Sequence, residues 1–387
     1  MNRFVKSALA IAVAGSAVHA GSGDNEWSAL DSEISGLASS LKQSQDSTGW
    51  AVLLRAVYTH SSDDLFTSGG EDTSGFNFND ADLAFWGTQG MYSWRFSADI
   101  SNNEAGVTGA TSLQLEDAYV RWNCGGYLDA TMGNFKPHIS HSNSIDPEHQ
   151  LFIDRSAIGS SGDFWDDGVA ASGSFDMLRW YAGLTNGTNG HTRDHFYYLR
   201  AEFDLGTGAG EYEGAMGSSD TLNATVGLSF LHDDNFGDIS GDGDHDANAY
   251  LLDFHGSVSQ IGFGFEIAQF GEDFIAATDE DFSNITDDGA GNSFLTLADD
   301  SHPWDVYGSY MINQDWEVGI RYEDLDNSEV LGANGPDNTL ISVGANWYRG
   351  ANAGKWQAQY TMVDADTGNG FNDGNLFEVG YSIGTTR

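Results

Sequence analysis

The chain of 387 residues carries 15 Lys and Arg against 58 Asp and Glu, a formal net charge of −43. A surface this acidic repels polyphosphate backbones, which excludes nucleic acid as a partner. Such a charge is also common in disordered chains, but a content of 13% aromatic residues predicts a folded protein. The one cysteine, Cys124, has no partner for an internal disulfide, so the fold must be stabilised by other means.

Residues 1–20 have the features of a secretory signal peptide. Arg3 and Lys6 precede an apolar stretch over residues 8–18, and Val18-His19-Ala20 approximates a small-x-small cleavage site. The alternative, a membrane anchor, is disfavoured because the apolar stretch is too short to span a bilayer as a helix. Cleavage after residue 20 leaves 13 Lys and Arg and a formal net charge of −45.

Residues 21–48 differ in pattern from the rest of the chain. Leu30, Ile34, Leu37 and Leu41 recur at helical spacing, with serine and glutamine between them. The pattern predicts a short periplasmic helical segment, to which the sequence assigns no function.

From Trp50 onward, apolar residues recur at every second position. Trp50, Val52 and Leu54 share one face, for example, while polar or small residues occupy the other. Most of the alternating segments are about 9–13 residues long, which suits a tilted strand that crosses a bilayer, whereas soluble strands usually have about five or six residues. A soluble sandwich gives the same alternation, so strand length decides for a membrane protein. Sixteen segments follow this pattern, near residues 50–60, 76–86, 91–101, 112–123, 126–135, 166–174, 177–186, 195–206, 220–232, 246–258, 260–270, 303–312, 315–325, 338–349, 353–363 and 374–384.

The connections between these segments alternate between long and short. Long connections outside and short ones inside are typical of bacterial outer-membrane barrels, and an even strand number returns the C-terminus to the periplasm. One inner connection, about 207–219, is long and breaks the rule. Aromatic residues cluster near strand ends, as expected of interfacial girdles. Residues 49–387 are therefore predicted to form an all-β, transmembrane antiparallel β-barrel of about 16 strands, embedded in the lipid of the bacterial outer membrane.

Basic residues mark the face opposite the apolar one. An arginine on the lipid side would cost about 2–4 kcal/mol at the midplane, so these side chains are predicted to face the lumen. They form a candidate row of anion-attracting groups: Arg55, Arg95, Arg121, Arg179, Arg200 and Arg321. The alternative is that any polar residue in such a strand must face the lumen. Because acidic residues share this face, both anion and cation preference stay open: Asp99, Asp117, Glu202, Asp204, Asp253, Glu266, Glu317 and Glu378.

The connection 136–165 is the candidate pore constriction. Lys136, His138 and Arg155 concentrate basic or titratable groups in this segment, together with His141 and His149. The apolar run 151–153 is suited to anchor a loop that folds inward against the wall. The alternative is an ordinary exposed surface loop.

Metal and enzyme signatures are weak. The three histidines at 138, 141 and 149 lack the spacing of a zinc site. Asp238, Asp242 and Asp244 lie in an acidic loop that is a candidate for weak divalent binding, but the twelfth position counted from Asp238 is Ala249 rather than the glutamate of a calcium loop. A solvated acidic loop is the alternative. Neither a nucleophile elbow nor a phosphate-binding loop is present, so we expect no enzyme activity and no cofactor.

Several short stretches resemble the phosphate-selective porin O and P family. They are Leu115-Glu116-Asp117-Ala118-Tyr119-Val120, Gly133-Asn134-Phe135-Lys136-Pro137-His138, Phe152-Ile153-Asp154-Arg155-Ser156, and Gly344-Ala345-Asn346-Trp347-Tyr348 with Lys355-Trp356-Gln357-Ala358-Gln359-Tyr360. The resemblance implies a sixteen-stranded, homotrimeric porin whose third loop folds inward. Members selective for phosphate have lysine- and arginine-rich pores, whereas this chain has only four lysines, so phosphate selectivity does not follow from the resemblance.

The sequence as a whole predicts an outer-membrane porin, a channel for passive diffusion of small hydrophilic solutes or ions, with anions such as phosphate as candidates. The alternative is a barrel that acts through its outer loops as an adhesin, a surface-binding protein or an enzyme.

Overall fold

A computed structural model describes the protein over residues 47–62, 73–100, 113–125, 127–187, 195–234, 246–271, 301–325, 338–350, 354–364 and 373–384. The predicted signal peptide, nearly all of the predicted helical segment 21–48, and Asp238, Asp242 and Asp244 lie outside these residues. Within the described ranges, no helix has the length and apolarity to span a bilayer.

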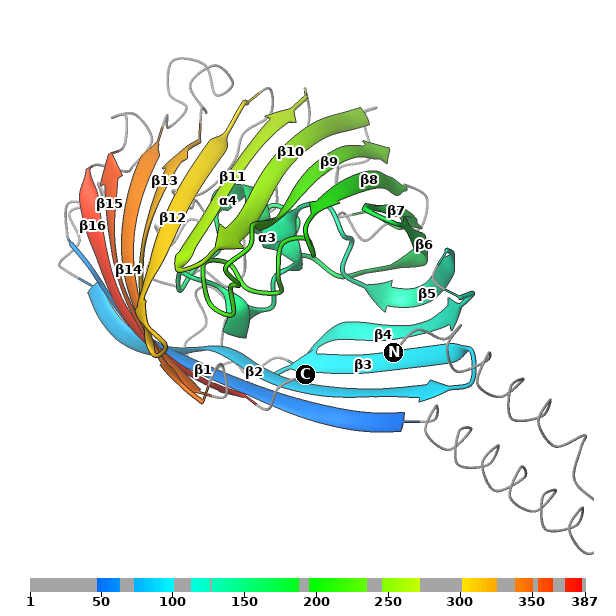
Figure 1. Cartoon of the computed structure of the whole chain (residues 1–387), viewed down its shortest axis with the longest axis horizontal. Coiled ribbons are helices and arrows are strands. Elements are labelled where there is room, and N and C mark those ends of the chain that lie inside the picture. The colour runs from blue at the N-terminus through cyan, green and yellow to red at the C-terminus, as the bar shows by residue number, and fades with distance from the viewer. Residues whose placement is uncertain are drawn as a thin grey trace, which may run out of the picture. The chain divides into compact units, whose positions relative to one another are not determined.

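Sixteen antiparallel strands follow one another around a closed barrel (Figure 1). Most of the strands have 8–13 residues, which confirms the strand number and the lengths predicted from the alternating pattern. Their bounds are β1 Ser47–Ser61, β2 Thr73–Gln89, β3 Tyr92–Asp99, β4 Gln114–Asn123, β5 Asp129–Phe135, β6 Asp166–Phe175, β7 Leu178–Thr185, β8 Phe196–Leu205, β9 Asn223–Asp234, β10 Asp246–Val258, β11 Ile261–Phe270, β12 Trp304–Asn313, β13 Trp316–Asp324, β14 Thr339–Arg349, β15 Gly354–Asp364 and β16 Gly374–Gly384.

The barrel closes through the pairing of its first and last strands. β1 pairs with β16 from Leu53 opposite Gly384 to Ser61 opposite Leu376. Closure matters because an unpaired backbone group in hydrocarbon costs several kcal/mol, and a closed sheet has no free edge. The backbone N–H and C=O groups of each strand therefore form hydrogen bonds with the two neighbouring strands. The side chains are not needed for this pairing, so one face of the strand can contact lipid while the other lines the lumen.

The outward face is apolar along the strands. Leu199, Leu228 and Ile320 are more than half exposed on this face, and the charged residues between them point inward. Aromatic pairs lie towards both ends of the wall. Trp316 stacks on Trp347 with ring centroids 5.8 Å apart near the short connections, and Trp304 contacts Tyr322 at 5.1 Å near the opposite end. This distribution is that of an interfacial girdle around an apolar band.

The interior of the barrel holds residues 136–165, which we name the infolded loop. It contains two short helices, α3 (His141–Ser144) and α4 (Ala157–Ser160), and the 3-10 turn η3 (Pro147–His149). Figure 1 shows α3 and α4 within the ring of strands. Ser140 and Ser156 cap these helices by accepting backbone hydrogen bonds from Asn143 and Gly159. The main apolar cluster joins this loop, through residues such as Ile139 and Ile158, to inward-facing side chains of the wall.

Candidate pore constriction

The carbonyl groups of the infolded loop are bound by cationic and amide side chains of the wall. Arg55 donates to the carbonyl of Ile153 at 2.8 Å, and Lys355 donates to the carbonyl of Gln150 at 2.7 Å. The remaining contacts of this kind run from Arg200 to Ile139 at 3.1 Å, from Arg321 to Asp154 at 2.9 Å, and from Asn346 to Leu151 at 2.8 Å. A buried segment without regular secondary structure leaves backbone groups unpaired, so these side chains replace the partners that a strand or helix would supply.

The N–H groups of the same loop are bound by acceptors of the wall. Glu266 accepts from the backbone N–H and the hydroxyl of Ser142 at 3.2 and 2.5 Å. Glu323 accepts from the N–H of Ala157 at 2.8 Å. Gln359 accepts from the N–H of Ile153, also at 2.8 Å. The acids on the lumen face therefore bind the loop, as the arginines do.

An apolar anchor completes the attachment. Leu151 and Phe152, two residues of the apolar run 151–153, form a buried cluster with Tyr307 of β12 and so anchor the loop to the wall. The Arg321 guanidinium lies 4.6 Å from the centre of the Phe152 ring. Glycines in β13 and β14 leave room for these side chains, since a Cβ at Gly319 would lie 2.9 Å from Leu151. Side chains of the loop thus occupy the space that these glycines leave in the wall.

The structure divides the nine basic candidates into two groups. Four side chains are at most 3% exposed and bind the loop or lie within it: Arg55, Arg155, Arg200 and Arg321. Four others are between 20% and 34% exposed: Lys136, His138, Arg95 and Arg179. The ninth, Arg121, is partly exposed. The predicted single row of arginines is therefore two sets, because the infolded loop covers one part of the wall and leaves the other accessible.

The accessible set lies on β3, β4 and β7 and at the start of the loop. Arg95 pairs with Asp117 at 2.6 Å, and Arg179 pairs with Asp204 at 2.7 Å. Arg121 instead donates to the hydroxyl of Thr131 at 3.1 Å and lies 5.3 Å from the centre of the Tyr119 ring. Among the described residues, no carboxylate forms an ion pair with Arg121. Its charge is therefore the least compensated of this set.

Lys136 and His138 each bind an acid. Lys136 forms an ion pair with Asp163, which also accepts from Arg155 at 2.8 Å. Burial alone would raise the pKa of Asp163, but the charges of Arg155 and Lys136 outweigh it and hold this pKa below its ordinary value. His138 lies 3.0 Å from Glu202, and burial lowers the pKa of its imidazole despite this partner. The pair Lys136–Asp163 closes the neck of the loop, where the chain enters and leaves the lumen.

A cavity of about 320 Å³ lies beside two members of the accessible set, His138 and Arg179. It is bounded by His138, Asp146 and His149 of the loop, by Arg179 and Glu202 of the wall, and by Glu211 of the connection between β8 and β9. Charged groups of both signs thus meet in one space.

Sequence reasoning missed several residues of this site. Lys355, Glu323, Gln359 and Asn346 bind the loop, but nothing in the alternating pattern separates them from other inward polar residues. One buried group, Asp253, His255 and Glu266, brings three possible metal ligands within 4.8 Å of one another. Arg200 already donates to both oxygens of Asp253, and His255 lies 3.0 Å from Glu266, so these atoms serve the loop attachment.

The sequence model of the family described as phosphate-selective porin O and P matches residues 59–229. No curated protein sequence matches the chain. Among solved structures, a loop-deletion variant of OmpT from Vibrio cholerae is similar, with 13% identity and a TM-score of 0.55, covering 88% of this chain and 100% of its own. An anion-selective porin from Comamonas acidovorans has 10% identity and a TM-score of 0.55, with the same coverage. The channel DcaP of Acinetobacter baumannii has 14% identity and a TM-score of 0.55, covering 89% of this chain and 98% of its own.

The family match confirms the resemblance over residues 59–229, which hold the stretches 115–120, 133–138 and 152–156, and the three structures share the barrel fold. The match and the barrel favour a channel over an enzyme or an adhesin. The closed barrel of sixteen strands and its apolar outer band have the architecture of an outer-membrane porin, and residues 59–229 match the model of the phosphate-selective porin O and P family.

Proposed function

We propose that the protein lets small hydrophilic solutes diffuse passively through the outer membrane, along the part of the lumen that the infolded loop leaves accessible. The hydrogen bonds that attach the loop to the wall end on β8, β9, β11, β13, β14, β15 and β1. The opposite wall, from β3 to β7, carries the exposed charged side chains. The route of the solute runs between this wall and the loop.

Small inward side chains on β5 and β6 support this route. Arg121, Thr131 and Ala170 are cross-strand neighbours, so their side chains share the lumen face. Ser172 lies opposite Asp129 on the same face. Thr131, Ala170 and Ser172 extend less far into the lumen than the arginines of the flanking strands.

The proposed solutes are small anions, phosphate among them. Five basic groups border the route, and the observation that carries the proposal is that Arg121 has no carboxylate partner among the described residues. The similar barrel from Comamonas acidovorans is described as anion-selective. A positive local field favours the entry of anions into a narrow passage, even where the net charge of the whole surface is negative.

Planar-bilayer recording tests this function. The purified protein is expected to give discrete channels, and a salt gradient is expected to give a reversal potential of the sign for anion preference. Arg121→Gln should lower the ratio of anion to cation permeability about twofold, the effect of one unit charge about 8 Å from the ion in water when it is screened by salt at a Debye length of about 8 Å.

Arg349→Gln is the matched control. This arginine is exposed at the end of β14, where it lies over Trp347 at 5.1 Å, away from the lumen. It should leave the permeability ratio unchanged. A wild-type protein without channel steps at any salt concentration would refute the function, and a cation-directed reversal potential would refute the proposed solute class.

We also propose that the mature protein begins after residue 20 and assembles as a homotrimer. The charge and apolar pattern of residues 1–20 supports the first part, and the family resemblance supports the second. Chemical cross-linking of the detergent-solubilised protein should give a ladder that ends at three chains, and N-terminal sequencing should start at Gly21. A ladder that ends at one chain would rule out the trimer.

A further inference from the structure

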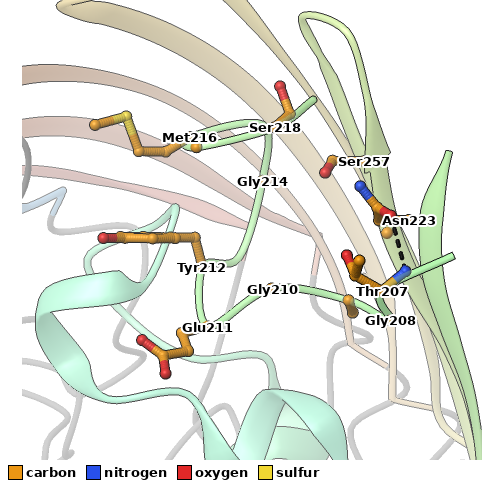
Figure 2. Close-up of a pocket in the computed structure, with 13 residues that line it drawn as sticks. Thr207, Gly208, Gly210, Glu211, Tyr212, Gly214, Met216, Ser218, Asn223 and Ser257 are labelled. Carbon is orange, nitrogen blue, oxygen red and sulfur yellow. Dashed lines mark hydrogen bonds between the residues drawn. The ribbon is translucent and has the colours of Figure 1, made fainter. Parts of the chain in front are cut away.

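The connection between β8 and β9 is unusually long for its side of the barrel. The neighbouring links on this side, between β6 and β7 and between β10 and β11, have two residues each. The segment 207–219, which we name the inner link, lies in the barrel interior beside the infolded loop. Figure 2 shows Glu211 and Tyr212 pointing away from the wall residues Asn223 and Ser257 and towards the ribbon of that loop.

The inner link is bound directly to the infolded loop. The N–H of Glu213 donates to the carbonyl of His149 at 3.1 Å, and the carboxylate of Glu213 accepts from the N–H of Leu151 at 2.8 Å. The rings of Tyr212 and His149 lie 4.5 Å apart. Glu213 is buried, so both contacts are shielded from solvent. Two segments from opposite ends of the barrel therefore meet in the lumen.

The wall holds the inner link from the other side. The N–H of Ala215 donates to Glu317 of β13 at 2.6 Å. At its start, the N–H of Thr207 donates to Asn223 at 2.9 Å, the contact drawn in Figure 2. Gly214 has a φ of +104°, and a Cβ on Gly262 of β11 would lie 2.2 Å from its carbonyl carbon. The close approach requires glycine at both positions.

We propose that the inner link is a second constriction element of the channel, and that Glu211 acts there as a charge-selecting residue opposite Arg179; this inference rests on the proposed function. Glu211 is exposed and borders the same 320 Å³ cavity as Arg179 and His138. A solute that passes Arg179 therefore meets a carboxylate next. Tyr212 packs against His149, which borders this cavity, and so holds the loop side of the passage in place, while Glu211 reduces the anion preference that the arginines create.

Two substitutions separate width from charge. Tyr212→Ala should raise single-channel conductance, because it removes the ring that packs against His149 at the edge of the cavity without changing charge. Glu211→Gln keeps the size of the side chain, and should raise the ratio of anion to cation permeability about twofold, as expected for one unit charge about 8 Å from the ion in water when it is screened by salt at a Debye length of about 8 Å.

Asp176→Asn is the matched control for charge. Asp176 is an exposed acid on the short link between β6 and β7, with a φ of 55° that asparagine also tolerates. It removes the same charge at the same end of the barrel but outside the cavity, so conductance and permeability ratio should stay at the wild-type values.

Cross-linking tests the placement of the link independently of conductance. His149→Cys and Tyr212→Cys, combined with Cys124→Ser, should be joined by a short thiol-reactive cross-linker in the folded protein, while either single cysteine should not. A conducting wild-type protein in which the pair does not cross-link, or in which Tyr212→Ala and Glu211→Gln both behave as the wild type, would overturn this inference alone. Absence of channels in the wild type would instead refute the proposed function, and this inference with it.

Discussion

At the scale of single residues, the same sequence signal leads to two different environments. Arg121 and Arg200 both alternate with apolar residues in their strands, and both point into the lumen. Arg200 is buried and donates to both oxygens of Asp253, at 2.6 and 2.9 Å. Arg121 is partly exposed beside Tyr119. The difference comes from the infolded loop, which covers β8 and leaves β4 accessible.

His141 makes the docking of the infolded loop sensitive to pH. Burial, and then the charge of His255, hold its pKa well below the ordinary value of 6.5. The groups that face it are His255, Glu266, Arg200 and Glu202 of the wall. The docked loop therefore binds fewer protons than an undocked one, so docking weakens as the pH falls below about 6.5, by up to about 1.4 kcal/mol per pH unit.

Hydrogen exchange of residues 139–145 at pH 7.5 and 5.5, corrected for intrinsic rates, measures this effect. Exchange should accelerate at the lower pH in the wild type. His141→Phe keeps a ring for the contact with His255, 4.4 Å away, and should show a smaller acceleration because the titrating group is gone. Equal acceleration in the two proteins would show that another group is responsible.

At the scale of elements, the infolded loop depends on the wall for its conformation. Its helices have four residues each, too short to be stable alone, and backbone groups that they leave unpaired are bound by side chains of the wall strands. The apolar anchor around Phe152 adds packing to these hydrogen bonds. Removal of the anchor should therefore loosen the loop while the strands of the barrel keep their pairing.

Phe152→Ala should weaken docking of the loop by about 3–5 kcal/mol, the usual cost of emptying a buried aromatic site. The expected readouts are larger current noise and a higher mean conductance in single-channel recordings, with heat-modifiable gel migration retained. Phe175→Ala is the control, since this ring is 51% exposed on the outer face. Identical recordings from the two variants would contradict the anchoring role.

At the scale of the whole molecule, the apolar band and barrel closure depend on each other. Ile320 lies in the middle of β13, opposite Gly308 and Val343, and is 55% exposed. Ile320→Arg should lower the free energy of folding into lipid vesicles by about 2–4 kcal/mol. Ile312→Arg, at 56% exposure near the end of β12, should cost about 0–1 kcal/mol because its charge reaches the interface. If denaturant titrations gave equal losses of folding free energy for the two variants, Ile320 would not face the bilayer centre.

The sequence alone determined the wall of this protein. A strand has a period of two, so the alternation from Trp50 onward was sufficient to predict the strand number, their lengths and which side chains face lipid. The predicted and observed strands agree closely, as for residues 246–258 and 374–384. The connection 136–165 was also predicted to fold inward, because its apolar run needed a buried contact.

The contents of the lumen were decided by tertiary structure. Inward-facing polar residues look alike in a sequence, and only the path of the infolded loop separates Arg55, which binds it, from Arg95, which stays exposed. The long link 207–219 broke the expected alternation, but its length alone did not indicate that it enters the barrel. Its place depends on contacts between residues far apart in the chain, such as Ala215 with Glu317, and such contacts have no local signature.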